Sequence, residues 1–136
     1  EIIERNSSEQ TNSIKPILNA NEILEMQRFN EKIYADKIII EYIADIVNAT
    51  RNPKDYDLDL ETMIEFGASP RASIWLMRTA KANALLNGRG FIIPEDVKAV
   101  VHEVLRHRII LTFEAEANGI TTDKIIDFVL EKISTP

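Results

Sequence analysis

Apolar side chains recur along this chain with the period of an α-helix, and this spacing leaves little choice of fold. In residues 36–51 they stand at positions i, i+3, i+4, i+7 and i+8, which form one face of a helix: Ile39, Tyr42, Ile43, Ile46 and Val47. Four glycines and five prolines among 136 residues are too few for a fold built from many turns. We therefore predict a mainly α fold, a helical bundle of about five helices with short extended segments.

The expected helices begin and end at residues typical of helix termini. The central helix, residues 70–86, is apolar over much of its circumference, so Trp75 and Met77 are expected in the core. Asn21 is expected to cap the first helix. Helices are expected at 22–29, 36–51, 70–86, 94–105 and 122–133, one helical turn at 61–66, and extended segments at 91–93 and 107–111.

The composition restricts the class of protein. A chain of 136 residues that is 45% hydrophobic can bury one sizeable core. The absence of cysteine excludes disulfides and thiolate metal sites and fits a reducing compartment, so we expect a cytoplasmic protein. No apolar run is long enough to cross a membrane, and the first residues lack the pattern of a signal peptide. A net charge of −6 argues against general binding of nucleic acid.

The charge is unevenly distributed along the sequence. Residues 69–111 contain seven basic and three acidic side chains, a balance of +4, which leaves −10 for the remainder of the chain. A basic middle would suit an anionic ligand, although solvated helix faces explain it equally well. The basic residues are Arg71, Arg78, Lys81, Arg89, Lys98, Arg106 and Arg108.

Motifs of catalysis are missing from the sequence. It has neither a phosphate-binding P-loop nor a glycine-rich turn between a strand and a helix. His102 and His107 are not spaced as metal ligands, and acidic pairs such as Asp57 and Asp59 are better explained as solvated side chains. We therefore expect no metal site and no catalytic residues in this chain alone.

One segment nevertheless has the residues of an anion site. Gly67 can form a turn, Ser69 can cap the following helix, and Pro70 suits its first position because its φ angle is already helical. Arg71 then stands at the open N-terminus, where the helix dipole favours anions. The segment indicates either a phosphate-reading arginine or an ordinary capped helix with a surface arginine.

Four segments in this order resemble the MoxR-type AAA+ ATPases. Residues 67–72 (Gly-Ala-Ser-Pro-Arg-Ala) are similar to the sensor 2 motif of that family, and Thr50-Arg51 resembles the end of one of its helices. Residues 89–97 and 104–109 resemble its hairpin-to-helix step and its Leu-x-His-Arg element. The resemblance implies a C-terminal helical lid at residues 21–136, preceded at 1–20 by a linker and the tail of an α/β ATPase core.

The resemblance also implies roles for individual residues. Arg71 would be the sensor 2 residue that reaches the γ-phosphate of ATP, and Ser69 and Pro70 would position the turn. Arg51 and the pair His107-Arg108 would contact the core or a neighbouring subunit, or pair with acids inside the lid. The catalytic segments of the family would lie upstream, so the fragment alone would not be catalytic.

The same resemblance implies cofactors and partners. The full-length protein would bind ATP and Mg²⁺, with no cofactor expected in the fragment, and would join its own α/β core in a homo-oligomeric ring, such as a hexamer. It would remodel partner proteins as a chaperone does, with proteins that carry von Willebrand factor A domains among the partners. Two other functions stay open: a free-standing helical protein-interaction module without nucleotide function, and a DNA-binding helical domain.

Overall fold

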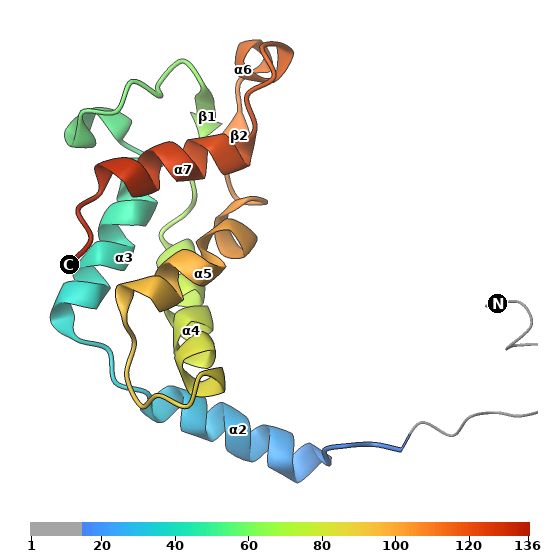
Figure 1. Cartoon of the computed structure of the whole chain (residues 1–136). Coiled ribbons are helices and arrows are strands. Elements are labelled where there is room, and N and C mark those ends of the chain that lie inside the picture. Colours follow the sequence, from blue (N-terminus) through green and yellow to red (C-terminus); the bar gives the residue numbers. More distant parts are fainter. Residues whose placement is uncertain (1–14) are drawn as a thin grey trace, which may run out of the picture.

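The computed structural model describes residues 15–136, which form six α-helices, a 3₁₀ helix and a two-stranded sheet (Figure 1). The prediction of a mainly α fold is therefore confirmed. In chain order the elements are α2 (Ala20–Lys32), α3 (Lys37–Ala49), η1 (Pro53–Tyr56), β1 (Ile64–Phe66), α4 (Arg71–Leu86), α5 (Pro94–Leu105), β2 (Ile110–Leu111), α6 (Phe113–Ala117) and α7 (Thr122–Lys132).

Helix α4 is the centre of the bundle, as its sequence predicts. It contacts α2, α3 and α5, and α7 lies across α3 and α5 (Figure 1). One stripe of α4 is completely buried, and three of its four members are alanines, so a neighbouring helix can approach closely. The stripe consists of Ala72, Leu76, Ala80 and Ala84.

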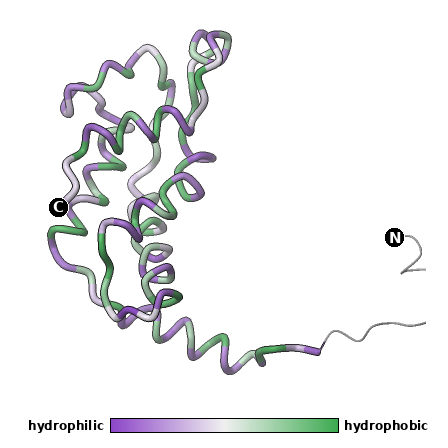
Figure 2. The backbone as a smooth tube through the Cα atoms, in the orientation of Figure 1, coloured by the Kyte–Doolittle hydropathy of each residue, from purple (hydrophilic) through white to green (hydrophobic). Residues whose placement is uncertain are grey.

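The predicted apolar faces of the other core helices are also confirmed. All five residues of the α3 stripe are buried, and α5 and α7 bury stripes of the same period. Green and purple segments alternate along these helices in Figure 2, as expected for helices with one apolar face. The buried residues of α5 and α7 include Val97, Val101, Val104, Leu105, Ile125, Ile126 and Val129.

Helix α2 differs from its prediction. Its cap is Asn19 rather than Asn21: the Asn19 side chain accepts a hydrogen bond from the Glu22 N–H at 3.0 Å, and the Glu22 carboxylate accepts one from the Asn19 N–H at 2.6 Å. This reciprocal pair satisfies two donors at once, which a cap at Asn21 would not. The helix continues to Lys32, and none of its residues is buried.

The segment 61–66 also differs from its prediction. A hydrogen-bonded turn is present at its start, where the N–H groups of Met63 and Ile64 both donate to the Leu60 carbonyl at 3.0 Å. The turn does not continue to residue 66, because the segment ends in strand β1, which pairs antiparallel with β2 and places Ile64 opposite Leu111 and Phe66 opposite Ile110. The pairing satisfies backbone groups that a single helical turn would leave open. The extended segments at 107–111 and 91–93 are confirmed in part, by β2 and by a parallel bridge between Tyr34 and Phe91.

The core prediction for Trp75 is wrong. Its side chain is 48% exposed, whereas that of the adjacent Leu76 is completely buried, and Met77 is only half-buried. Successive residues of a helix point about 100° apart, so the buried stripe through Leu76 turns Trp75 toward the surface. Within residues 15–136 every helix is too short or too polar to cross a membrane.

Candidate functional site

Two of the predicted motifs meet at one point in the fold. The turn that precedes α4 lies against the end of α3, and Gly67 packs directly against the backbone there. A Cβ atom added to Gly67 would lie 2.1 Å from the carbonyl oxygen of Thr50 and 2.8 Å from the Cα atom of Arg51. Since no side chain fits in this space, the approach of the two segments requires glycine.

A hydrogen-bonded threonine fixes the same contact. The hydroxyl of Thr50, a residue that is only 1% exposed, donates to the carbonyl oxygen of Val47 at 2.7 Å. It also accepts a hydrogen bond from the backbone N–H of Ala68 at 3.0 Å. We call this arrangement, Thr50 with Gly67 and Ala68, the α3 latch; it holds the turn of the Gly-Ala-Ser-Pro-Arg motif against the last turn of α3.

The start of α4 bears out one expectation and corrects another. Pro70 has the predicted helical backbone angles, φ −55° and ψ −24°, but it stands at the N-cap, one place before the first residue of α4. The prediction that the Ser69 side chain caps the helix is wrong, because no side-chain cap bond is present at this terminus in the described structure. The Ser69 backbone carbonyl instead accepts a hydrogen bond from the Ala72 N–H at 2.8 Å. The latch, rather than the serine hydroxyl, fixes this turn.

Arg71 is the first residue of α4, and its side chain is exposed. Among residues 15–136 no carboxylate lies within ion-pair distance of it. Helix α4 carries three cationic residues and no acidic one, so nothing on the helix itself offsets the positive end of its dipole. The planar guanidinium has the donors to bind two phosphate oxygens at once.

A groove runs along one face of α4, and Arg71 is not among the residues that line it. Ile74, Arg78 and Lys81 lie on this face and line a space of about 840 Å³ between α2, α3 and α4. The guanidinium of Arg78 lies over the ring of Trp75, 5.6 Å from its centroid. The groove therefore combines apolar side chains with two cationic residues of α4 and one acidic residue of α2, Glu31.

The other residues predicted to contact the core or a neighbouring subunit, Arg51, His107 and Arg108, have different surroundings in the structure. Arg51 is exposed next to the latch, so the structure brings it to the same corner as the turn of Arg71. Arg108 is half-buried, and its Nε donates to the backbone carbonyl of Val104 at 2.9 Å; among the described residues it pairs with a carbonyl at the end of α5 rather than with an acid. His107 is exposed and belongs to neither arrangement.

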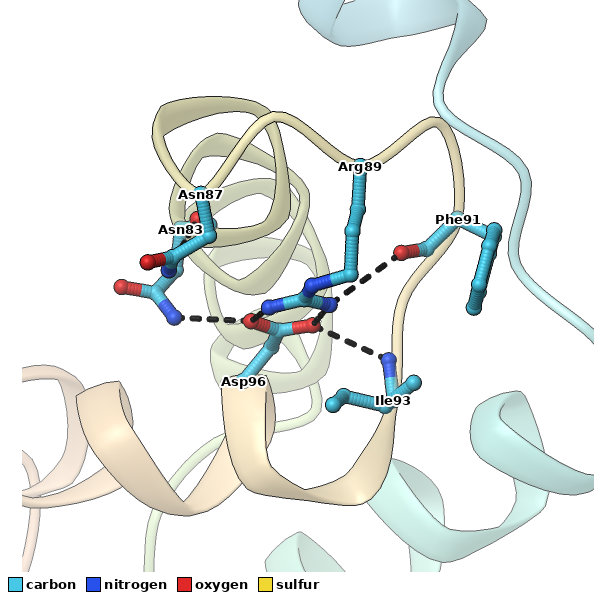
Figure 3. A network of polar contacts seen from close by, with 6 residues as sticks. All are labelled: Asn83, Asn87, Arg89, Phe91, Ile93 and Asp96. Atoms are coloured by element: carbon cyan, nitrogen blue, oxygen red, sulfur yellow. Dashed lines mark hydrogen bonds and ion pairs between the residues drawn. The ribbon is translucent and has the colours of Figure 1, made fainter.

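The structure also shows a polar cluster for which the sequence suggested no role (Figure 3). The carboxylate of Asp96, which is 1% exposed, binds the guanidinium of Arg89 through both oxygens. It also accepts from Asn83 Nδ2 at 2.8 Å and from the Ile93 N–H at 3.0 Å. These bonds tie the end of α4, the following loop and the first turn of α5 together. An acidic residue at the third position of a helix, preceded by an arginine in the loop, was the available signal.

The ionisation of Asp96 follows from these contacts. Burial alone would raise the pKa of its carboxyl group, but the hydrogen bonds from Arg89, from the Ile93 N–H and from Asn83 outweigh this effect, so the net shift of the pKa is downward. The carboxylate is consequently charged and fully bonded at neutral pH. The described residues contain no group of three acidic or histidine side chains that could hold a metal ion.

Comparison with known proteins gives one matching family and several relatives. The AAA lid domain family matches residues 57–128. The chain is 36% identical over 123 residues to the protein named Chaperone MoxR1 of Mycobacterium tuberculosis. This match covers 90% of the present chain and 33% of the relative. It is 39% identical over 84 residues to Protein MoxR of Paracoccus denitrificans, covering 58% of this chain and 25% of the relative.

A solved structure has the same fold. The crystal structure of a candidate ATPase from Cytophaga hutchinsonii superimposes with a TM-score of 0.90 and 40% identity, over 99% of this chain and 42% of that one. Two curated relatives match about nine-tenths of this chain, and the chain spans about a third of the length of each of them.

Proposed function

The chain belongs to the AAA lid family and is the helical lid of a MoxR-type AAA+ protein, and we propose that this lid senses nucleotide through Arg71. The observation that carries the proposal is the latched turn before α4. It places an exposed arginine, without an acidic partner among the described residues, at a helix N-terminus without a side-chain cap. Such a terminus combines a favourable helix dipole with a cation that can bind two phosphate oxygens at once.

The mechanism follows from what Arg71 can bind. In the proposed closed state its guanidinium pairs with the γ-phosphate of ATP, and hydrolysis removes that partner. ATP and ADP then favour different positions of the lid, because only ATP has the γ-phosphate that pairs with Arg71 in the closed position. A hydrogen bond to a charged group contributes about 1.5–3 kcal/mol, which corresponds to roughly a 10- to 100-fold change in the response to nucleotide.

The remaining roles concern a longer polypeptide that contains this lid. We propose that it is a cytoplasmic ATPase that binds ATP and Mg²⁺ in its α/β core and assembles as a homo-oligomeric ring. The name of the Mycobacterium relative, a chaperone, supports remodelling of partner proteins as the output. Proteins with von Willebrand factor A domains are proposed as partners. Arg51, beside the turn of Arg71, is proposed to face the core or a neighbouring subunit.

The test compares ATP hydrolysis by the full-length protein with hydrolysis by its Arg71→Ala and Arg71→Lys variants. Arg71→Ala should lower kcat/KM for ATP by about 10- to 100-fold, and Arg71→Lys should recover only part of the loss, because lysine cannot bind bidentately. Arg28→Ala removes the same charge from an exposed position on α2 and should behave like the wild type. Turnover of Arg71→Ala at the wild-type rate and KM would refute the sensing role and favour a protein-interaction module.

A further inference from the structure

We infer that Thr50 is a positioning residue for Arg71: its side-chain hydroxyl fixes the turn that aims the arginine. The inference rests on the proposed nucleotide-sensing function and adds to it a residue on a different helix. Thr50 ends α3, whereas Arg71 begins α4, and the hydroxyl joins positions separated by 18 residues in the sequence.

The Thr50 hydroxyl is placed to act as a fixed anchor rather than as a surface group. Its donor side is committed to the Val47 carbonyl at 2.7 Å, which orients its lone pairs, and its acceptor side receives the Ala68 N–H at 3.0 Å. Thr50 is 1% exposed and Ala68 is completely buried, so water has little access to either group. A buried N–H without its acceptor is unfavourable, so the turn has one strongly preferred position.

The backbone between this anchor and Arg71 is short and restricted. Only Ser69 and Pro70 stand between Ala68 and the first residue of α4, and the ring of Pro70 restricts one of the few rotatable bonds on that path. On the other side of the anchor, Gly67 packs against the Thr50 carbonyl with no room for a side chain. A displacement at Ala68 is therefore carried to the base of the Arg71 side chain.

Removal of the Thr50 hydroxyl is the selective perturbation of the latch. Valine has nearly the shape of threonine but neither donates nor accepts, so Thr50→Val keeps the packing and deletes both bonds. Thr50→Ser keeps the hydroxyl. Thr112 offers a matched control, because its hydroxyl also bridges two backbone groups, the carbonyl of Thr62 at 2.7 Å and the N–H of Ala115 at 3.2 Å, but at the sheet and α6.

The experiment measures kcat and KM for ATP with the full-length protein. Thr50→Val should lower kcat/KM for ATP by about 10-fold, because a small displacement of the Arg71 guanidinium weakens its directional, charged contact with the γ-phosphate. Thr50→Ser should stay within about two-fold of the wild type, and so should Thr112→Val. If Thr50 acts through Arg71, Thr50→Val should cause less than about a two-fold further loss in the Arg71→Ala background.

The outcomes separate the two proposals. An equal loss from Thr50→Val in the wild-type and Arg71→Ala backgrounds would show a general structural role and overturn the inference, as would wild-type kinetics of Thr50→Val. Wild-type kinetics of Arg71→Ala would instead overturn the proposed function. If Thr50→Val does not fold, Thr50→Cys replaces it: its weakly hydrogen-bonding thiol should give a smaller loss with the same dependence on Arg71, and a loss independent of Arg71 would again overturn the inference.

Discussion

The substitution Asp96→Asn should destabilise the fold strongly although it changes the side chain by a single group. The carboxylate is 1% exposed and accepts four hydrogen bonds, two of them from Arg89. An asparagine amide has one acceptor oxygen, and its NH₂ group would face donors that the carboxylate now binds. At least one donor of Arg89 or Asn83 therefore loses its partner.

The magnitude follows from the charge and the burial of this contact. Hydrogen bonds to a charged group contribute about 1.5–3 kcal/mol each, and a buried ion pair that loses one partner typically costs about 3–5 kcal/mol. The Arg89 side chain is 26% exposed, so water can solvate part of the guanidinium after the substitution. We therefore expect Asp96→Asn to lower the free energy of unfolding by about 2–4 kcal/mol, below the upper limit for a buried pair that loses one partner.

Urea unfolding of the purified chain, followed by circular dichroism at pH 7, measures this change. Asp123→Asn is the matched control, because Asp123 also pairs with an arginine, Arg106 at 2.7 Å, but both side chains are almost half exposed. Its free energy of unfolding should stay close to the wild-type value, since exposed pairs contribute little. A loss for Asp96→Asn no larger than that of Asp123→Asn would refute the argument that the buried carboxylate holds α4 and α5 together.

Three further predictions concern the stability of the same chain and can be checked by the same unfolding measurement. Because the folded-state pKa of Asp96 is lowered, its contribution is complete above the unfolded pKa of about 4 and is lost as the pH falls through the folded value; the difference between wild type and Asp96→Asn should therefore shrink below pH 4 or so. Gly67→Ala should cost about 3 kcal/mol or more, because its Cβ would overlap a backbone carbonyl, whereas Gly90→Ala, with nothing within 4 Å, should be neutral or slightly stabilising. Leu76→Ala should cost about 2–5 kcal/mol, and Trp75→Ala, despite the larger side chain removed, less than half as much; the reverse order would contradict the assigned faces of α4.

Periodicity predicted the helices well wherever it also determined which face is buried. In α3 most apolar residues occupy one stripe, so both the helix and its buried side follow from the sequence, although Ile38 and Ile40 lie outside the stripe and are exposed. In α4 they occupy most of the circumference, so the pattern shows a helix without indicating which side faces inward. The alanines decide it, because they allow α5 to come close, and Trp75 is left at the surface.

Non-local contacts account for the other differences. Strand β1 exists because Ile64 and Phe66 pair with β2, far along the chain, and three residues contain no local signal for that pairing. Ser69 is typical of a helix cap, yet the contact with Thr50 fixes the turn and leaves the serine hydroxyl without that role.

The candidate site was predicted in its parts rather than in its arrangement. The motif around Arg71 and the Thr-Arg helix end are both visible in the sequence, but their contact depends on how the end of α3 packs against the turn before α4. The sequence pattern explains Gly67 as a turn residue, whereas the structure shows that glycine is needed for the close approach of two backbones.

Because α4 is one uninterrupted helix of 16 residues, it also works as a stiff rod with a length of about 24 Å. Arg71 stands at one end of the rod, and the loop anchored by Asp96 is attached to the other. A tilt of about 10° around the Arg71 end would displace the far end by about 4 Å, since a helix of this length bends little. A change in the contacts of the Arg71 side chain can thus move the loop at the opposite end of α4 by several ångströms.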